Sequence, residues 1–144
     1  MIKVLLAMIA ASLFAGAALY VSLAEHPARM RLDDRSALAQ WGPSYARAAP
    51  MQAGLALLSL LLGFWAWWRI GGGWLLAASL LIGAAIPLTL AIIMPVNNRL
   101  KATAPDAAGP ESRALLARWG NLHALRTSLG LASVAAYFCA FLQP

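Results

Sequence analysis

Residues 4–24 read VLLAMIAASLFAGAALYVSLA, an apolar stretch that contains no charged side chain. Lys3 precedes it and Glu25 follows it. A helix of about 20 apolar residues is long enough to cross the roughly 30 Å of hydrocarbon in a bilayer. The stretch also exceeds the apolar core of about 7 to 15 residues found in a cleaved signal peptide. We therefore predict a retained membrane-spanning helix over residues 3–24.

Further uncharged stretches follow along the chain, so the first span is one of four. In the longest of them, residues 71–73 are consecutive glycines, which predict a turn between two spans. The predicted spans are residues 3–24, 48–68, 74–94 and 118–141. Backbone polar groups in lipid must be hydrogen-bonded within helices, and short connections make neighbouring helices antiparallel. The sequence therefore predicts an all-α integral membrane protein, an antiparallel four-helix bundle that forms a single domain over residues 1–144.

The composition of the whole chain supports the membrane class. Of its 144 residues, 62% are hydrophobic, and the mean hydropathy is +0.71. These values are too apolar for a soluble domain of this size. The formal net charge of +6 does not indicate nucleic-acid binding, because the basic residues are not interleaved with aromatic residues on a soluble surface. We predict membrane lipids as partners, and no nucleic acid.

The distribution of lysine and arginine predicts the orientation in the membrane. Most basic residues lie in or beside the two longer connections, residues 25–47 and 95–117. These basic residues are Arg29, Arg31, Arg35, Arg47, Arg99, Lys101, Arg113 and Arg118. The opposite side has only Lys3 and Arg69. Because positive charges favour the cytoplasmic side, we predict cytoplasmic loops at 25–47 and 95–117, with both termini outside.

Pro87 lies in the middle of the predicted third span. Proline has no backbone N–H, and its ring collides with the preceding turn of a helix. We therefore predict a kink that frees a backbone carbonyl. In a bundle, such a kink can open a cavity.

Antiparallel connectivity brings several unusual polar and aromatic residues to one side of the membrane. The end of the first span, the start of the second, the end of the third and the start of the fourth all lie there. The candidate binding residues are Tyr20, Glu25, His26, Tyr45, Asn97, Asn98, Arg118, Trp119, His123 and Arg126. Their convergence at one mouth of a small bundle predicts a polar pocket.

The fourth span carries the most specific pattern. At 100° per residue, Trp119, His123 and Arg126 fall within an arc of about 60°. Arg126 lies about 12 Å along the helix axis from the start of the span, where full exposure to lipid is costly. It therefore faces inward or snorkels. If it faces inward, topology makes Glu25 its nearest acidic partner, and the asparagines that follow the third span are the alternative.

Each candidate also has a structural interpretation, which the sequence leaves open. His26 is placed to cap a helix, and His123 fits a buried structural histidine. Arg126 fits a residue that only holds helices together. The tyrosines and Trp119 fit interfacial anchors, and the asparagines fit a helix C-cap.

An ordered set of short motifs resembles a known family. HPAR (residues 26–29) follows the first span, Pro87 and Thr89 lie in the third, MPVNNRL (94–100) ends it, and RWGNLHALR (118–126) opens the fourth. The whole chain resembles the small four-helix membrane proteins grouped with anthrone oxygenases. Fungal members convert anthrones to anthraquinones with dioxygen and without an evident metal or flavin, so the resemblance implies a similar reaction and no cofactor. It does not imply a particular substrate. We predict that the protein lies in the cytoplasmic (inner) membrane of a bacterium.

The leading functional hypothesis is oxidation of a lipophilic phenol, quinol or anthrone by dioxygen at this pocket. His123 or His26 would remove the acidic proton. Arg126 and Asn97 would stabilise the oxyanion, and Trp119 with Tyr20 would hold the aromatic ring. Tyr45, Asn98, Glu25 and Arg118 complete the predicted binding residues.

Two alternatives stay open. The first is a non-catalytic membrane protein that binds a lipophilic small molecule or supports a membrane complex, for instance as a homo-oligomer. The second is a bundle that binds haem or a transition metal through His26 and His123. Two histidines without a cysteine or acidic cluster are a weak metal signal, so we predict no metal site.

Overall fold

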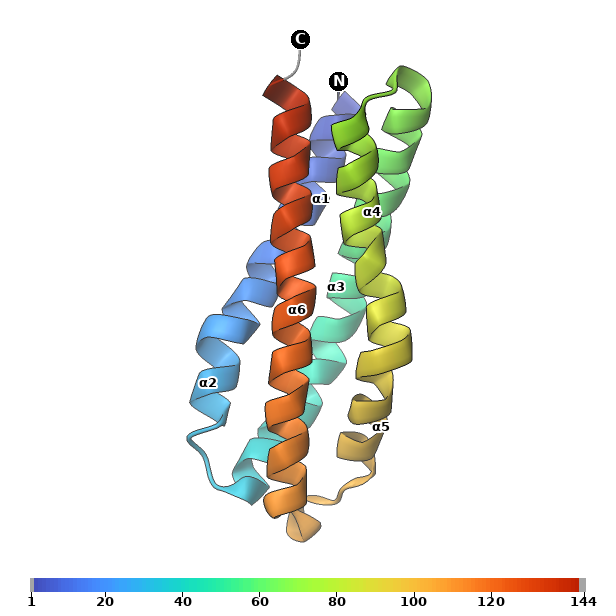
Figure 1. Cartoon of the computed structure of the whole chain (residues 1–144). Helices are drawn as coiled ribbons and strands as arrows, with labels where there is room; N and C mark the ends of the chain where they lie inside the picture. Colours follow the sequence, from blue (N-terminus) through green and yellow to red (C-terminus); the bar gives the residue numbers. More distant parts are fainter. Residues whose placement is uncertain (1, 143–144) are drawn as a thin grey trace.

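The computed structural model describes residues 2–142, which form four helical rods in an antiparallel bundle (Figure 1). The first rod comprises α1 (Ile2–Tyr20), the π-helical turn η1 (Val21–Glu25) and α2 (His26–Arg29). The second rod is α3 (Asp34–Ile70). The third comprises α4 (Gly73–Leu88), the π-helical turn η2 (Thr89–Ile93) and α5 (Met94–Ala102). A short 3-10 helix, η3 (Pro105–Ala107), leads to the fourth rod, α6 (Pro110–Leu142).

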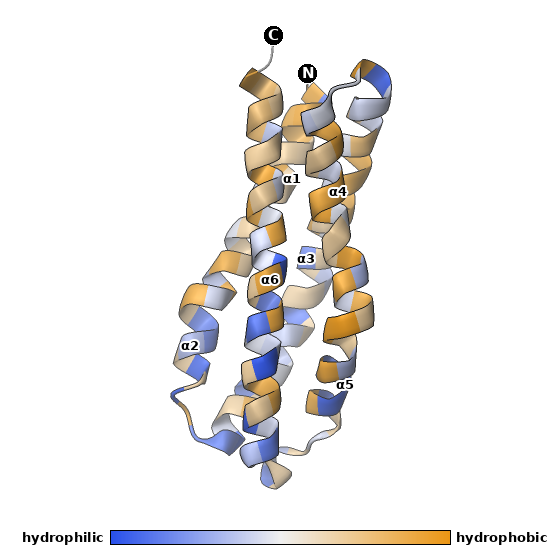
Figure 2. Cartoon of the chain, in the orientation of Figure 1, coloured by the Kyte–Doolittle hydropathy of each residue, from blue (hydrophilic) through white to orange (hydrophobic). Residues whose placement is uncertain are grey.

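The rods are membrane helices that form a closed ring of neighbours. All four are long and apolar enough to cross a membrane, which confirms the predicted all-α integral membrane bundle. Helix α1 packs against α3 and α6, and α4 packs against the same two helices. Helix α3 has 37 residues, or about 55 Å, against roughly 30 Å of hydrocarbon. Hydrophilic residues gather at one end of the bundle, which is the end opposite the termini (Figure 2).

The predicted polar loops at 25–47 and 95–117 were too long, because most of these residues are helical. The rods are joined on this side by residues 30–33 and 103–109. Charged residues mark where a chain leaves the hydrocarbon, but they do not end a helix. Helix α3 begins at a cap instead: the Asp33 carboxylate accepts a hydrogen bond from the Ser36 backbone N–H at 3.0 Å. Hydrogen bonds from Ser36 keep the pKa of this carboxyl group below its usual range.

The turn predicted at residues 71–73 is confirmed. Gly71 has φ +73° and Gly72 has φ +98°, a region that side chains with a Cβ rarely adopt. The backbone N–H of Gly71 donates to the carbonyl of Trp67 at 2.7 Å. The two glycines therefore end α3 and reverse the chain into α4.

The irregularity predicted at Pro87 takes the form of a π-helical turn. Pro87 has no backbone N–H to donate within the helix. The π-helical turn η2 begins two residues later, and there the helix widens but continues. The Thr89 hydroxyl donates to the carbonyl of Ala85 at 2.7 Å. A second π-helical turn, η1, lies in the first rod, which swings outward near this turn (Figure 1). The two π-helical turns lie in the polar half of the bundle, on the first and third rods, which stand opposite each other.

Small residues allow α1 and α6 to approach closely. A Cβ added to Gly130 would lie 2.8 Å from the ring of Phe14, which is fully buried. This contact holds the two helices together at the level where the polar half of the bundle begins.

Candidate functional site

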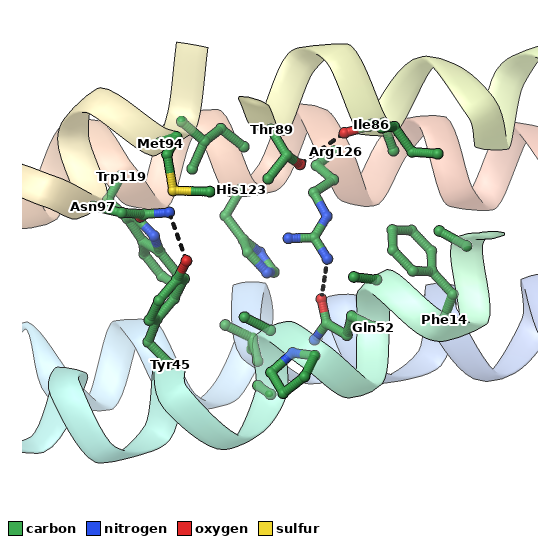
Figure 3. A pocket seen from close by; sticks show the side chains of 18 of the residues that line it. Phe14, Tyr45, Gln52, Ile86, Thr89, Met94, Asn97, Trp119, His123 and Arg126 are labelled. Atoms are coloured by element: carbon green, nitrogen blue, oxygen red, sulfur yellow. Dashed lines mark hydrogen bonds between the residues drawn. The ribbon is translucent and has the colours of Figure 1, made fainter. Parts of the chain in front are cut away.

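A cavity of about 440 Å³ lies in the polar half of the bundle, between α3, η2 and α6. Its size falls within the range of about 300–1,000 Å³ that is usual for small-molecule sites. Most of the lining is apolar, but a few polar side chains reach it from α3, η2, α5 and α6 (Figure 3). The labelled polar residues in this view are Tyr45, Gln52, Thr89, Asn97, His123 and Arg126.

Arg126 is buried in the cavity wall with an incompletely paired guanidinium. Its exposed fraction is 8%, and its Nη2 donates to Gln52 Oε1 at 2.7 Å. The guanidinium carbon also lies 5.1 Å from the centroid of the Phe14 ring. Among residues 2–142, Arg126 makes no ion pair with a carboxylate. A buried cation with one neutral partner attracts an anion into the cavity.

Glu25, the predicted partner of Arg126, is instead paired with Arg29. Arg29 is only 2% exposed, and its Nη2 lies 2.5 Å from Glu25 Oε1. Gln40 and Ser44 complete this network by contacting both charged groups. The one-turn spacing of Glu25 and Arg29 on the same rod favours this pair over a partner across the bundle. Glu25 therefore neutralises Arg29, and Arg126 has no carboxylate counter-ion within residues 2–142.

His123 faces the cavity from α6, one turn from Trp119 (Figure 3). The two rings are stacked, with centroids 4.9 Å apart and an interplanar angle of 28°. The His123 Nδ1 lies 3.1 Å from the Ser22 hydroxyl. That hydroxyl lies 3.0 Å from the Thr127 hydroxyl. Ser22 belongs to η1, so the π-helical turn brings this partner to the histidine.

One arrangement of these hydrogen bonds places the imidazole proton on Nδ1. In it, the single hydroxyl proton of Thr127 goes to the His123 carbonyl, whose oxygen lies 2.9 Å away. Ser22 then donates to Thr127, and the Ser22 oxygen accepts from Nδ1–H of His123. A neutral imidazole with its proton on Nδ1 keeps its lone pair on Nε2. His123 can therefore act as a base through Nε2.

A second polar pair lies farther along the cavity (Figure 3). The Asn97 Nδ2 donates to the Tyr45 hydroxyl at 3.1 Å. The Tyr45 ring stacks on Trp41, with centroids 5.0 Å apart. Asn97 is fully buried, whereas Asn98 is exposed, because successive residues of a helix point about 100° apart. Of the two asparagines, Asn97 is thus the one that faces the cavity.

Five of the predicted residues lie outside the cavity lining, namely Glu25, which is paired with Arg29, and four others. Tyr20 is 63% exposed, because it precedes the inward-facing Ser22 by two residues, or about 200° of a helix. Arg118 is exposed, since it is one residue from the buried Trp119. Asn98 is exposed as well, and His26 packs against Trp119 and Gly120. Arg126, His123, Asn97, Trp119 and Tyr45 are brought together.

The geometry gives no support to shared metal or haem coordination by His26 and His123. Each imidazole packs against the ring of Trp119, at centroid distances of 5.4 Å and 4.9 Å. Within residues 2–142, no three side chains of the types His, Cys, Asp and Glu gather at one point.

Several site residues escaped the sequence analysis. Arg29 was read only as a topology charge, although it lies in the HPAR motif. Gln52 was a lone amide in an apolar span, and Thr127 follows His123 by one helical turn. Ser22 and Trp41 carried no signal that distinguishes them from ordinary span or interface residues.

The fold and the site define a class: an integral membrane helical bundle with an internal, mainly apolar cavity. A histidine lines this cavity together with a buried arginine that makes no ion pair within the described residues. The family model described as anthrone oxygenase matches residues 41–136, more than half of the chain. The protein therefore belongs to the anthrone oxygenase family. No curated protein and no solved structure matches the chain.

Proposed function

We propose that this protein oxidises a lipophilic phenol, quinol or anthrone with dioxygen, without a metal or organic cofactor. The observation that carries the proposal is the joint presence on one cavity wall of the His123 imidazole and the Arg126 guanidinium, which makes no ion pair among residues 2–142. A base next to a buried cation favours conversion of a weak acid into a bound oxyanion. Family membership supports the same reaction class.

The two polar pairs suit an aromatic substrate that carries oxygen at both ends. Tyr45 and Gln52 lie seven residues apart on α3, so the Tyr45–Asn97 and Gln52–Arg126 pairs are about 10 Å apart along the helix. Trp119 and Phe14 provide aromatic surface beside them. A fused ring system would lie between the pairs, with its oxyanion at Arg126 and a second oxygen at Tyr45.

The proposed reaction of an anthrone consumes one dioxygen and releases one water. His123 Nε2 removes a proton from the methylene carbon, and Arg126 stabilises the resulting oxyanion. The anion transfers one electron to dioxygen, and the two radicals combine to form a carbon–oxygen bond. The imidazolium returns its proton to the peroxide anion. Loss of the second methylene hydrogen and cleavage of the O–O bond then give a carbonyl group and water.

A substitution of the proposed base tests this function. We expect His123→Gln to lower anthrone turnover by about 100-fold or more, because general-base catalysis contributes on that order. His26→Gln is the matched control, because His26 lies outside the cavity lining, and we expect a much smaller loss. The measurement is dioxygen uptake and quinone formation by purified protein in lipid nanodiscs. Equal turnover of wild type and His123→Gln would reject the base, and tight binding without turnover would favour the non-catalytic binding role.

We further propose the inner membrane of a bacterium as the location, with lipids as partners. The loops at 30–33 and 103–109 would face the cytoplasm, because the basic residues cluster on their side. Assembly into a homo-oligomer is part of the same proposal.

A further inference from the structure

The cavity has an open side, which lies between α3 and η2. Among the described lining residues, the exposed ones all belong to these two elements. They are Pro50, Ala53 and Leu57 on α3 and Leu90 on η2. All lining residues from α1, η1, α2 and α6 are buried. Helix α3 packs closely on α4 but barely contacts η2 and α5, so the opening is in the side wall of the bundle. We call these four exposed residues the side mouth.

The two leucines of the side mouth, Leu57 and Leu90, face the acyl chains rather than water. The turn at residues 71–73 lies near one membrane surface, as indicated by Arg69 and the exposed Trp68 and Trp74 that flank it. Leu57 precedes Gly71 by 14 residues, or about 21 Å of helix. Leu90 follows residue 73 by 17 residues, or about 26 Å. Both distances lie within the roughly 30 Å of hydrocarbon, in the leaflet farther from the turn.

Polarity changes from the side mouth to the cavity interior. The side mouth consists of apolar residues, and Leu57 and Leu90 are 48% and 61% exposed. The base and the cation, His123 and Arg126, lie on α6 and are buried. A molecule that reaches them by this route dissolves in acyl chains first and presents its polar end inward. Its apolar end remains outside, where the wall is open.

We propose that the substrate enters sideways from one leaflet, between α3 and η2, and that it carries an apolar tail that stays among the acyl chains. The substrate class is thus an oxygenated aromatic head with an alkyl or isoprenoid tail. The chemistry of the head rests on the proposed function, whereas the route rests on the side mouth alone.

The route can be tested by reversible blocking of the side mouth. Leu57→Cys is prepared in a Cys139→Ser background, reconstituted in phosphatidylcholine nanodiscs, and modified with a bulky aromatic methanethiosulfonate. The probe is a dodecyl phenol with a diazirine on the ring, and the readout is its photolabelling of cavity residues by mass spectrometry. Leu61→Cys is the matched control, because Leu61 is 59% exposed on the same helix but does not line the cavity.

We expect modification of Leu57→Cys to lower cavity labelling by about tenfold or more, since a blocked path slows association. Reduction of the mixed disulfide should restore labelling in the same folded protein, and the modified Leu61→Cys protein should label like wild type. Unchanged labelling of modified Leu57→Cys would overturn the route.

The tail can be located with a second probe that carries the diazirine at the far end of the dodecyl chain. We expect this probe to label lipids and residues of the side mouth such as Leu90. Labelling of Arg126 or Phe14 by the tail end would overturn the assigned orientation.

Anthrone and phenol oxidation is measured in parallel on the same samples. If labelling depends on the side mouth but no oxidised product forms, the proposed function is rejected and the entry route is supported. If oxidation is unchanged when the side mouth is blocked, the entry route is rejected and the proposed function is supported.

Discussion

At the scale of the residue, two buried arginines in this protein have opposite electrostatic situations. Arg29 is ion-paired with Glu25, whereas Arg126 has the neutral Gln52 as its hydrogen-bond partner. Removing one member of a buried ion pair strands the other charge, which costs about 3–5 kcal/mol. Removing a cation that has no counter-ion relieves a burial cost instead. Arg126 is therefore better explained by a ligand than by stability.

The two arginines give a matched prediction about stability. We expect Arg29→Met to destabilise the protein by about 3–5 kcal/mol. We expect the double variant Arg126→Met, Gln52→Leu to be as stable as wild type or more stable, by up to about 4 kcal/mol, because no polar group is left unpaired. The measurement is thermal unfolding in detergent without ligand. A large loss of stability in the Arg126→Met, Gln52→Leu protein would show that Arg126 only holds helices together.

At the scale of the element, two π-helical turns and one close helix contact shape the cavity. The turn η1 carries Ser22 to His123, and η2 widens the third rod beside the cavity. The contact of Gly130 with Phe14 fixes α1 against α6 at the same level. Local backbone departures of this kind are common at functional sites.

The contact at Gly130 can be tested against another helical glycine. We expect Gly130→Ala to destabilise the bundle by about 1–3 kcal/mol, because its Cβ would collide with the Phe14 ring. Gly16→Ala is the control: no atom lies within 4 Å of a Cβ there, so helix propensity should make it neutral or stabilising. Thermal unfolding of both variants is the measurement. Equal stability of the two would contradict the close approach of α1 and α6.

The element scale also shows how much could be predicted from the sequence. The four spans, the glycine turn and the irregularity after Pro87 follow from hydropathy and backbone chemistry, so they were predicted. The ends of the helices were not predicted, because α3 starts at the Asp33 cap and not after the last charged residue before the apolar stretch. The inward face of α6 was predicted from one helical period. The residues that contact this face were not predicted. The register between rods depends on packing and on η1, and the hydropathy pattern does not indicate a π-helical turn.

At the scale of the whole molecule, the bundle is polar at one end, and both termini are at the other (Figures 1 and 2). The cavity lies in the polar half, so its membrane side follows from the orientation of the bundle. Eight basic residues lie in or beside the segments that join the rods at the polar end, against Lys3 and Arg69 at the other. From this charge distribution we predict that the cavity lies in the cytoplasmic leaflet.

This orientation predicts the result of reporter fusions. A reporter active only in the cytoplasm, inserted beside Asp106, should be active, and the same reporter at the C-terminus should be silent. A periplasmic reporter should give the opposite pattern at both positions. Periplasmic activity at Asp106 would reverse the orientation and move the cavity to the outer leaflet.

The central claim is that His123 and Arg126 together convert a bound weak acid into its anion. The most direct measurement is the absorption spectrum of an anthrone bound to the purified protein in the absence of dioxygen, which halts the reaction before oxidation. We predict the spectrum of the anion with wild type and that of the neutral anthrone with His123→Gln, both at neutral pH. A neutral anthrone bound tightly by the wild-type protein would contradict the claim.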